Sequence, residues 1–274
     1  MQVYYEGAHS ITFGDKHSWN DWHLIPKSMP IISPPPVHTN TVEVPGANGY
    51  VDLTDFPTGY PTYGNRIGSL EFYVDHTAEY WDWDNAYDAI INYLHGQKMK
   101  MILDDDHSFY YEGRFSLNTF KSEKMACTVT IDYDLFPYKF MRWSTGESSL
   151  WPWDPFDFQH GIIVSDSDFI FESNSTSTWT TLTEWDNVRV GVMPIIPTFK
   201  VNAENGGLDF MYANWNLDTS RSIDPHGVYH SAFLQNGTNS YPTIQFATPK
   251  PGDKTSFKFK GIGSVTIDFR QGRL

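Results

Sequence analysis

The sequence predicts a mainly β protein with one α-helix, on the basis of three observations. Aromatic residues form 16% of the chain, and their side chains favour strands. The 17 Pro and 20 Gly are typical of short strands joined by tight turns. Only one stretch, which ends at Gly96, repeats apolar residues convincingly at helical spacing. We therefore expect short antiparallel strands in both halves of the chain and a single helix in the first half.

The helix and the residues after it show the clearest local pattern. Four apolar residues lie on one stripe of the predicted helix: Trp83, Tyr87, Ile90 and Leu94. Gly96 ends the helix, because the residue after a helix often takes a left-handed conformation that suits glycine. Met99, Met101 and Leu103 alternate with the polar Lys98, Lys100 and Asp104, which predicts a strand over residues 99–103 with one buried face. Residues 109–115 resume as an aromatic-rich strand after a polar cluster. We expect these strands to form a hairpin packed under the helix.

The length of 274 residues fits two medium domains. We predict an N-terminal domain over residues 1–140, whose sheet is completed by a strand over residues 126–133, and a C-terminal domain over residues 141–274. A turn-rich joint over residues 144–158 lies between them. Three aromatic residues of this joint are expected to plug the boundary: Trp151, Trp153 and Phe156.

Beyond Gly161 every pattern is strand-like. Eight segments are expected as strands: residues 162–173, 177–184, 188–192, 197–202, 207–215, 243–248, 255–261 and 263–270. Short strands separated by Gly, Pro, Asn and Asp predict an antiparallel sandwich or jelly roll. The alternation is strongest near the end, where Phe257 and Phe259 are opposed to Lys258 and Lys260.

Two stretches of the first half do not resemble core strands. Residues 30–36 are rich in proline, which cannot donate regular ladder hydrogen bonds, so we expect an extended connector. A partner could pair beside it, although a stiff loop is the simpler interpretation. Residues 41–44 predict a strand, and residues 46–66 follow as an arm of weak strands. Such arms often carry contacts between subunits.

The formal charge of −14 argues against a protein that holds nucleic acid by its phosphates, because that requires clustered Lys and Arg. The lone Cys127 cannot form an internal disulfide, and its alternating neighbours predict a buried strand residue. The N-terminal residues lack the pattern of a signal peptide, and no run approaches the roughly 18 apolar residues of a membrane span. We therefore expect neither export by a signal peptide nor a membrane anchor.

Candidate chemical groups are few. The run Asp104-Asp105-Asp106-His107 offers oxygen and imidazole ligands, but its spacing differs from a calcium loop, and a hairpin tip explains it better. Asp82 and Asp84 are two residues apart on a predicted helix and point in different directions. The sequence has no GxSxG, HExxH, GxGxxG or P-loop motif. We expect no catalytic residue, no metal and no cofactor.

Aromatic residues of the second half raise a different possibility. Four of them could be exposed and stack on sugar rings: Trp179, Trp185, Tyr212 and Trp215. Packing between sheets is the commoner fate of such side chains, so both interpretations stay open. Asn174 and Asn236 each begin a glycosylation sequon, which we interpret as turn sequences.

Six short motifs follow one another through the first half. They are Val44-Pro45-Gly46 with Gly49 and Asp52, Asn65-Arg66, Leu94-His95-Gly96, Ile102-Leu103-Asp104-Asp105, Tyr110-Tyr111-x-Gly113-Arg114 and Pro137-Tyr138-Lys139. In their order and spacing over most of residues 1–140 the chain resembles the distal tail protein of siphophages, which have long, non-contractile tails. Residues 261–274 are similar to that family's C-terminus. Residues 145–260 carry no firm motif, so the second domain is assigned by position.

The resemblance implies a structural role in assembly. Members have an N-terminal β domain with one helix, six copies of which close into a ring, and a C-terminal galectin-like jelly-roll β-sandwich that faces outward. The homo-hexamer ring joins the tail tube protein to tail-tip or baseplate proteins, among them tail-associated lysin or receptor-binding proteins used in host adsorption. DNA crosses its channel only in transit, and no membrane is involved. The resemblance implies a place at the distal end of the phage tail in the virion, after synthesis in the host cytoplasm.

The shared motifs also implicate individual residues in assembly: Pro45, Gly46, Asp52, Asn65, Arg66, His95, Gly96, Asp104, Gly113 and Arg114. The acidic balance suggests that carboxylates facing the channel repel DNA, with ordinary solubility as the simpler explanation. Two other classes of function stay open beside a structural adaptor. One is a carbohydrate-binding module that contacts the host cell surface, with Trp179 and Trp215 as candidate contacts. The other is an enzyme, which would need a cleft with paired carboxylates or a metal.

Overall fold

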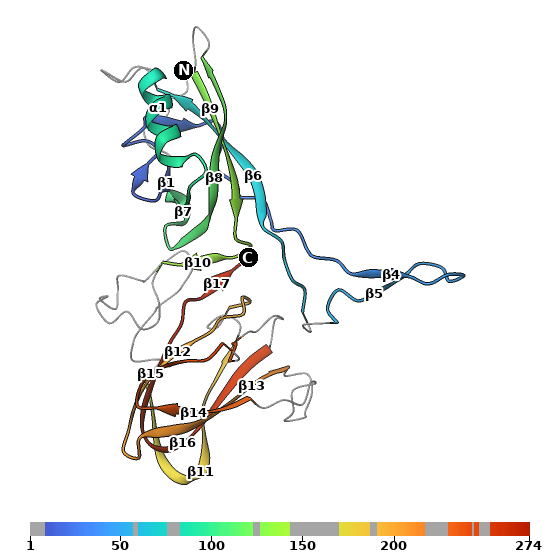
Figure 1. Ribbon diagram of the computed structural model, residues 1–274, viewed down its shortest axis with the longest axis vertical. Coiled ribbons are helices and arrows are strands. Elements are labelled where there is room, and N and C mark those ends of the chain that lie inside the picture. The colour runs from blue at the N-terminus through green and yellow to red at the C-terminus, as the bar shows by residue number, and fades with distance from the viewer. Residues whose placement is uncertain are drawn as a thin grey trace. The chain divides into compact units, whose positions relative to one another are not determined.

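The computed structural model describes residues 9–56, 60–75, 83–122, 127–142, 170–186, 191–216, 230–242, 244–246 and 253–274. The chain divides into two compact units, which we call unit 1 (Met1–Lys139 with Leu274) and unit 2 (Phe140–Arg273). Strands dominate both units, and α1 (Trp83–Leu94) is the one α-helix among the described residues (Figure 1). The predicted class, mainly β with one helix, is confirmed. No helix in the described part of the chain has the length and apolarity needed to cross a membrane.

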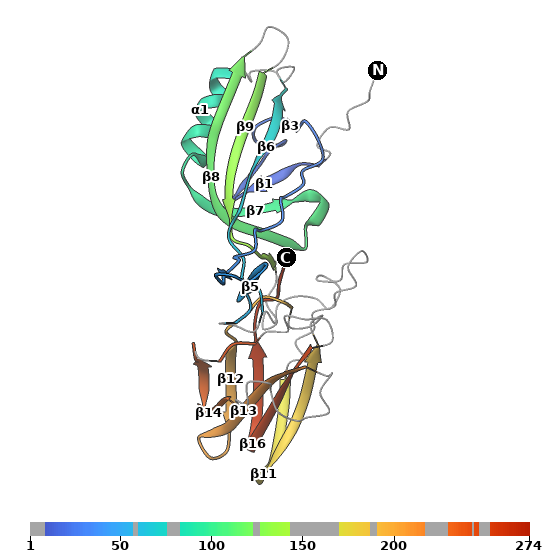
Figure 2. The ribbon, with the colours of Figure 1, turned by 90° about the vertical axis from the view of Figure 1, so that its right-hand side faces the viewer.

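Unit 1 is built on an antiparallel sheet in which seven strands follow the order β2-β1-β7-β8-β9-β6-β3. Their bounds are β1 Ile11–Phe13, β2 Lys16–His17, β3 Leu24–Pro26, β6 Arg66–Val74, β7 Lys98–Leu103, β8 Phe109–Ser122 and β9 Cys127–Leu135. Figure 2 shows α1 lying along β8 on one face of this sheet. The core of unit 1 lies between helix and sheet.

The helix ends where the sequence predicts. Ile90 and Leu94 are fully buried in the core. Gly96 has a φ of +74°, the left-handed conformation that glycine adopts without a steric penalty. Its amide donates a hydrogen bond to the carbonyl of Phe115 at 2.7 Å, which attaches the end of the helix to β8. Both the helix and its glycine cap are confirmed.

The predicted hairpin under the helix is also confirmed. Strands β7 and β8 pair from Lys98 with Arg114 to Met101 with Tyr111. A short 3₁₀ helix, η1 (Asp104–Asp106), lies in the turn between them. Strand β9 alternates as predicted, and its buried residues face the core: Cys127, Val129, Ile131, Tyr133 and Leu135.

Between β3 and β6 the described residues 36–56 and 60–64 form a long arm. At its root, Gly64 donates to the carbonyl of Pro36 at 2.8 Å, and His38 donates to the carbonyl of Thr62 at 2.9 Å. Toward its tip, β4 (Thr41–Glu43) pairs with β5 (Tyr50–Asp52) as a two-stranded sheet of its own. The proline-rich residues 30–36 form no regular strand, as predicted.

Unit 2 contains a second antiparallel sheet, with the order β14-β13-β16-β12-β15 and with β11 paired to β16. The bounds are β11 Ile170–Asp186, β12 Thr198–Ala203, β13 Gly207–Asn216, β14 His230–Gln235, β15 Gly237–Ser240 and β16 Asp253–Asp268. Two short strands lie off the main path of the other, nine-stranded sheet: β10 (Lys139–Met141) pairs with β17 (Gly272–Arg273) and also with β8. Buried phenylalanine side chains form the centre of the unit 2 core: Phe199, Phe210, Phe246, Phe257 and Phe259.

Strand β16 organises this sheet because it changes partners along its length. Its first half pairs with β13 up to Lys260, and its second half pairs with β12 from Gly263 onward. Gly261 and Gly263 have φ values of +139° and +156° at the change of partner, where the sheet curls. The two predicted strands over residues 255–261 and 263–270 are therefore one continuous strand, since glycine bends the strand here without ending it.

Strand β11 likewise joins two segments that were predicted as separate strands. Residues 170–173 and 177–184 were expected in separate strands, but β11 runs through both, with a register shift between Ser175 and Thr180. Strands β14 and β15 were not predicted. Several expectations lie outside the described residues: Asp82 and the side chain of Asp84, Trp151, Trp153, Phe156, and residues 162–169, 188–190 and 247–248.

Candidate functional site

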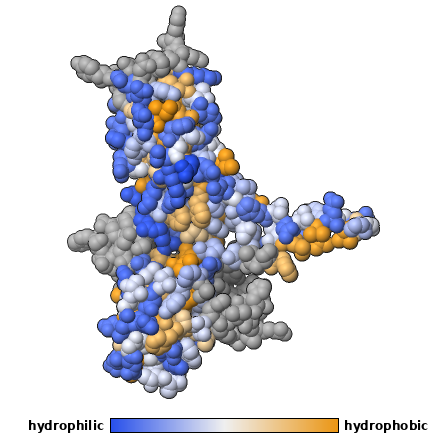
Figure 3. All heavy atoms as spheres, viewed as in Figure 1, coloured by the Kyte–Doolittle hydropathy of each residue, from blue (hydrophilic) through white to orange (hydrophobic). Residues whose placement is uncertain are grey.

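The tip of the arm presents two chemically different faces. Val42 lies opposite Val51 across the β4–β5 pair, so both side chains point to the same side. Glu43 lies opposite Tyr50 on the other side, next to the pair of Thr41 and Asp52. All six strand residues are exposed, and Figure 3 shows apolar atoms along one side of the arm. The arm thus offers a valine face that this chain leaves in solvent.

The turn of the arm contains two of the ten motif residues. Pro45 and Gly46 follow β4, and Gly46 has a φ of +82° with open space around the position of a Cβ. Asp52 lies near the end of β5 and accepts a hydrogen bond from the amide of Thr54 at 2.9 Å. Hydrogen bonds from the Thr54 side chain and amide lower the pKa of Asp52. These three residues shape the arm itself.

Arg66 holds the root of the arm from inside unit 1. Its side chain is 4% exposed. Its Nη1 donates to the carbonyl of Ser33 at 2.9 Å, and its Nε donates to the carbonyl of Pro137 at 2.8 Å. The guanidinium also lies over the Tyr111 ring, 5.7 Å from its centroid. Because Ser33 precedes the arm and Arg66 follows it, one side chain ties together the two ends of the arm segment.

Burial has an electrostatic consequence for Arg66. Removal from water lowers the pKa of its guanidinium, and its Nη2 is buried without a hydrogen-bond partner. A charged group is retained in such a place because its other nitrogen atoms satisfy backbone carbonyls that would otherwise be unpaired. Next to it, Asn65 donates to the carboxylate of Asp134 at 2.7 Å, which fixes the start of β6 against β9.

Gly113 of β8 pairs with Leu135 of β9 at a position that leaves no room for a side chain. A Cβ on this residue would stand 2.2 Å from the carbonyl oxygen of Asp134 and 2.6 Å from the Cα of Leu135. No backbone atom can be displaced that far without breaking the ladder, so only glycine fits. The motif requires glycine at this position because any side chain would clash with the backbone of β9.

Three further motif residues, His95, Gly96 and Arg114, surround the end of α1. His95 Nδ1 accepts a hydrogen bond from the amide of Leu117 at 3.1 Å. Arg114 donates to the carbonyl of Gly96, which satisfies a backbone group left free at the end of the helix. Sequence reasoning placed His95, Gly96 and Arg114 in assembly, and in the structure they join the helix to β8.

The three consecutive aspartates are each paired with a basic side chain of unit 1. Asp104 lies 3.1 Å from His17 Nε2, Asp105 lies 2.7 Å from His9 Nδ1, and Asp106 lies 2.5 Å from Lys139 Nζ. Within the described ranges, no group of three or more His, Cys, Asp or Glu residues is arranged to hold a metal ion. The pairs attach η1 to the neighbouring segments, as a hairpin tip requires.

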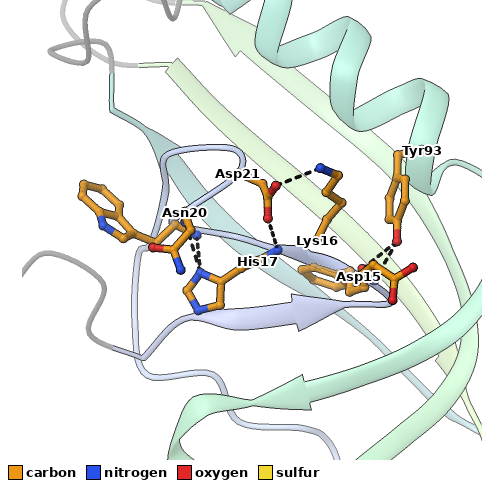
Figure 4. Close-up of polar contacts among 8 residues, drawn as sticks. Asp15, Lys16, His17, Asn20, Asp21 and Tyr93 are labelled. Carbon is orange, nitrogen blue, oxygen red and sulfur yellow. Dashed lines mark hydrogen bonds and ion pairs between the residues drawn. The ribbon is translucent and has the colours of Figure 1, made fainter.

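His17 belongs to a compact polar network in the β1–β2 hairpin, drawn in Figure 4. Its Nδ1 accepts from the amides of Trp19 and Asn20 at 3.3 and 3.1 Å, so its Nε2 carries the proton that faces Asp104. Asp21 accepts from Lys16 Nζ and from the His17 amide, both at 2.8 Å. The hydrogen bond from Lys16, followed by that from His17, lowers the pKa of Asp21. This network is structural.

One cavity of about 310 Å³ opens beside β3 and β6 in unit 1. Lys27 and Glu71 line it and form an ion pair of 3.1 Å with each other. Met29 and Ile31 are among the other lining residues and are exposed. Lys27 and Glu71 are the two ionisable residues of the lining, and they pair with each other.

Comparison with known proteins gives one informative relationship. No protein-family model matches this sequence, and no curated protein does. The crystal structure of the Dit protein (gp 19.1) of phage SPP1 superimposes with a TM-score of 0.55 at 14% sequence identity. The superposition covers 97% of this chain and 100% of that chain. This chain has the fold of SPP1 Dit. The resemblance to siphophage distal tail proteins predicted from the sequence is thereby confirmed as a likeness in fold.

SPP1 Dit is described as a paradigm of the hub adsorption apparatus in phages that infect Gram-positive hosts. Because the likeness to SPP1 Dit spans nearly the whole chain, it includes unit 2, where the candidate sugar contacts lie. Trp179 on β11 is exposed. For Tyr212 the structure decides between the two interpretations in favour of core packing: it is buried beside Phe210 and Phe246, because it lies on the inner face of β13. The side chains of Trp185 and Trp215 lie outside the described residues.

Proposed function

We propose that this chain is a structural protein of a phage tail, and that it serves as the distal tail adaptor. The observation that carries the proposal is the end-to-end likeness in fold to SPP1 Dit, a hub protein of an adsorption apparatus. A shared fold supports a shared role here because the likeness extends over both units rather than over one common domain. The virion, at the distal end of the tail, is the location this role implies.

We propose further that the protein acts as a homo-hexameric ring. Closed rings of identical subunits use contacts between two different surfaces of each copy. The arm suits one such surface, because its valine face is exposed and a two-stranded sheet alone is only marginally stable in water. A neighbouring copy that covers Val42 and Val51 would remove this apolar surface from solvent. Arg66 would then set the direction of the arm by holding both of its ends.

In this role the ring joins the tail tube protein to tail-tip, tail-associated lysin or receptor-binding proteins at the baseplate, and DNA crosses its channel. The formal charge of −14 supports a channel that does not retain DNA, because carboxylates and phosphates repel each other. An assembly of this kind works by shape and contact, so it needs neither catalytic residues nor a cofactor. Three of the ten motif residues, Pro45, Gly46 and Asp52, would serve assembly by shaping the arm, and the other seven would do so indirectly, by fixing the sheet from which the arm projects.

The experiment compares two single substitutions on opposite faces of the arm. Val42→Lys places a charge on the valine face, and Thr41→Lys places the same charge one residue away on the polar face, opposite Asp52. Masses of the purified full-length proteins are measured by light scattering after gel filtration, alone and with purified tail tube protein. We expect six-fold assemblies for the wild type and for Thr41→Lys, and their loss for Val42→Lys.

Two results would count against the proposal. If the wild type is monomeric in both conditions, the ring is wrong. If Val42→Lys assembles as well as Thr41→Lys does, the arm is not the contact. The far-UV circular dichroism of both variants serves as the control for folding, since both positions lie on the exposed arm.

A further inference from the structure

A row of four side chains, two exposed and aromatic and two partly exposed and charged, crosses the outer face of the unit 2 sheet. Asp209 on β13 lies opposite Phe233 on β14 and opposite Lys260 on β16. Lys260 extends its amine over the ring of Trp179 on β11, 5.1 Å from the ring centroid. In order across strands β14, β13, β16 and β11, the row therefore consists of Phe233, Asp209, Lys260 and Trp179. With strands about 4.8 Å apart, it spans roughly 14 Å.

The two aromatic rings at the ends of the row are exposed and held in place. Trp179 is 39% exposed and lies at the register shift of β11, where a bulge re-aims side chains. Phe233 is 50% exposed, and its ring covers Gly207, where a Cβ would stand 2.6 Å from the ring. The carbonyl of Phe233 accepts a hydrogen bond from the hydroxyl of Tyr241 at 3.0 Å. The packing of its ring on Gly207 and the hydrogen bond to its carbonyl restrict Phe233, which reduces the conformational entropy that this residue loses when a ligand covers it.

The centre of the row is polar and electrically balanced. Lys260 Nζ and a carboxylate oxygen of Asp209 form an ion pair of 3.1 Å. Both side chains stay partly exposed, so the ammonium retains donors and the carboxylate retains acceptors for further hydrogen bonds. A balanced pair gives no net attraction to a charged ligand. The charge of −14 on the whole chain would moreover repel an anion.

These features select one class of ligand. A neutral sugar has an apolar face of C–H groups that packs on an aromatic ring, and hydroxyl groups at its edge that need both donors and acceptors. A row with an aromatic ring at each end and a donor–acceptor pair between them matches several linked sugar rings. We propose that this face, formed by Trp179, Lys260, Asp209 and Phe233, binds a neutral oligosaccharide. This site does not depend on ring formation by unit 1.

Unit 1 contains a closely matched arrangement that serves as an internal control. Tyr73 on β6 is also 39% exposed, and Lys27 Nζ lies 5.2 Å from its ring centroid. Lys27 likewise forms an ion pair of 3.1 Å, with Glu71. Tyr73 lies opposite Ile25 and Thr128, however, so no second aromatic ring shares its row. An exposed aromatic ring under a lysine is thus present in both units, but a row with two rings is present in unit 2.

The test uses the full-length protein on two arrays, one of immobilised neutral oligosaccharides of one to six rings and one of sulfated or uronic-acid oligosaccharides. We expect the wild type to bind neutral oligosaccharides and to show no binding to the sulfated or uronic-acid oligosaccharides. Trp179→Ala should weaken binding at least tenfold, and Trp179→Phe should restore part of it because stacking is retained. Tyr73→Ala should bind as the wild type does. Phe233→Ala should weaken binding of oligosaccharides of three or more rings but leave single rings unaffected.

The proposal fails if the wild type binds nothing on the neutral array, or prefers the charged array. It also fails if Trp179→Ala binds as well as the wild type, or if Tyr73→Ala loses as much affinity as Trp179→Ala. Thermal unfolding of each variant separates loss of a contact from loss of the fold. Light scattering of the same samples shows whether assembly is intact, so a failure of this site is distinguishable from a failure of the ring.

Discussion

The Nε atom of Arg66 donates a hydrogen bond to the backbone carbonyl of Pro137 at 2.8 Å, across 71 residues of sequence. Arg66 begins β6, and Pro137 follows β9. The same guanidinium holds the carbonyl of Ser33 at 2.9 Å, so a single side chain joins three segments at the root of the arm.

Replacing Arg66 by Ala should destabilise unit 1 by about 2 to 4 kcal/mol, because two backbone carbonyls lose their partner in a buried place. Arg66→Lys should recover little of this loss, since one ammonium cannot reproduce the fork of a guanidinium. Hydrogen exchange of the β6 and β9 amides in urea measures the free energy of unfolding of unit 1. Arg114→Ala is the matched control, because Arg114 is exposed in the same sheet, and its loss should remain below about 1 kcal/mol. If Arg66→Ala and Arg114→Ala lower the free energy of unfolding by the same amount, the buried hydrogen bonds of Arg66 do not stabilise unit 1 more than those of an exposed arginine.

Gly113→Ala tests the contact between β8 and β9. A Cβ at this position would stand 2.2 Å from a backbone oxygen, so the strands must separate locally. We expect a loss of about 2 to 4 kcal/mol in unit 1, measured as for Arg66. Gly46→Ala is the control, because Gly46 has a positive φ but open space around it. Gly46→Ala should lower the stability by about 1 kcal/mol, and the effect should be confined to the arm. A Gly113→Ala protein as stable as the wild type would contradict the close approach.

Much of unit 1 could be predicted from the sequence because its signals are local. The cap at Gly96 and the alternation of β9 each depend on neighbouring residues, and the backbone had no stronger competing constraint there. Unit 2 was harder, since the glycines at 261 and 263 are turn residues in most contexts but here bend one long strand. Strands β14 and β15 were missed because their polar segments carry little hydrophobic alternation.

The proposed functional surfaces were less predictable than the fold, because they depend on register between distant strands. Arg66 was identified from a motif, but its burial could not be inferred, since arginine is rarely buried. Trp179 was identified as a candidate sugar contact. Its neighbours Lys260, Asp209 and Phe233 were not, because only the pairing of four strands brings them into one row.

The pH dependence of unit 1 should report on Asp21. The hydrogen bonds from Lys16 and from the His17 amide lower the pKa of Asp21 in the folded state. Ionised Asp21 therefore adds to the free energy of unfolding of unit 1 at pH values above its unfolded pKa of about 4. That contribution is lost as the pH falls through the lowered folded value. Asp21→Asn should therefore reduce stability at pH 7, by about 1 kcal/mol at most, and the difference from the wild type should vanish in acid. Urea unfolding between pH 2 and pH 7 measures this.

Asp15→Asn is the control for this experiment, because Asp15 is exposed in the same hairpin. Its stability should follow the pH curve of the wild type. A difference between Asp21→Asn and the wild type that persists at pH 2 would indicate that charge on Asp21 is not the cause.

The side-chain amide of Asn236 stabilises unit 2 because it makes the pair of hydrogen bonds that a backbone residue of a neighbouring strand would make. Its Oδ1 accepts from the amide of Ala203 at 2.7 Å, and its Nδ2 donates to the carbonyl of the same residue at 2.8 Å. The side chain thus continues the pairing of β12 beyond Val201, which lies opposite Gly237 at the start of β15. The sequon at Asn236 is therefore a structural element, whose amide is already fully engaged.

Asn236→Ala should destabilise unit 2 by about 1 to 3 kcal/mol, because both backbone groups of Ala203 lose this partner. Asn236→Asp should also destabilise, since a carboxylate can accept from the amide but repels the carbonyl. Hydrogen exchange of the β12 amides measures the effect and should show it first at Ala203. Asn174→Ala is the matched control, because Asn174 begins the other sequon and is exposed on β11. If the two substitutions change the exchange of Ala203 equally, the paired hydrogen bonds of Asn236 do not hold the end of β12.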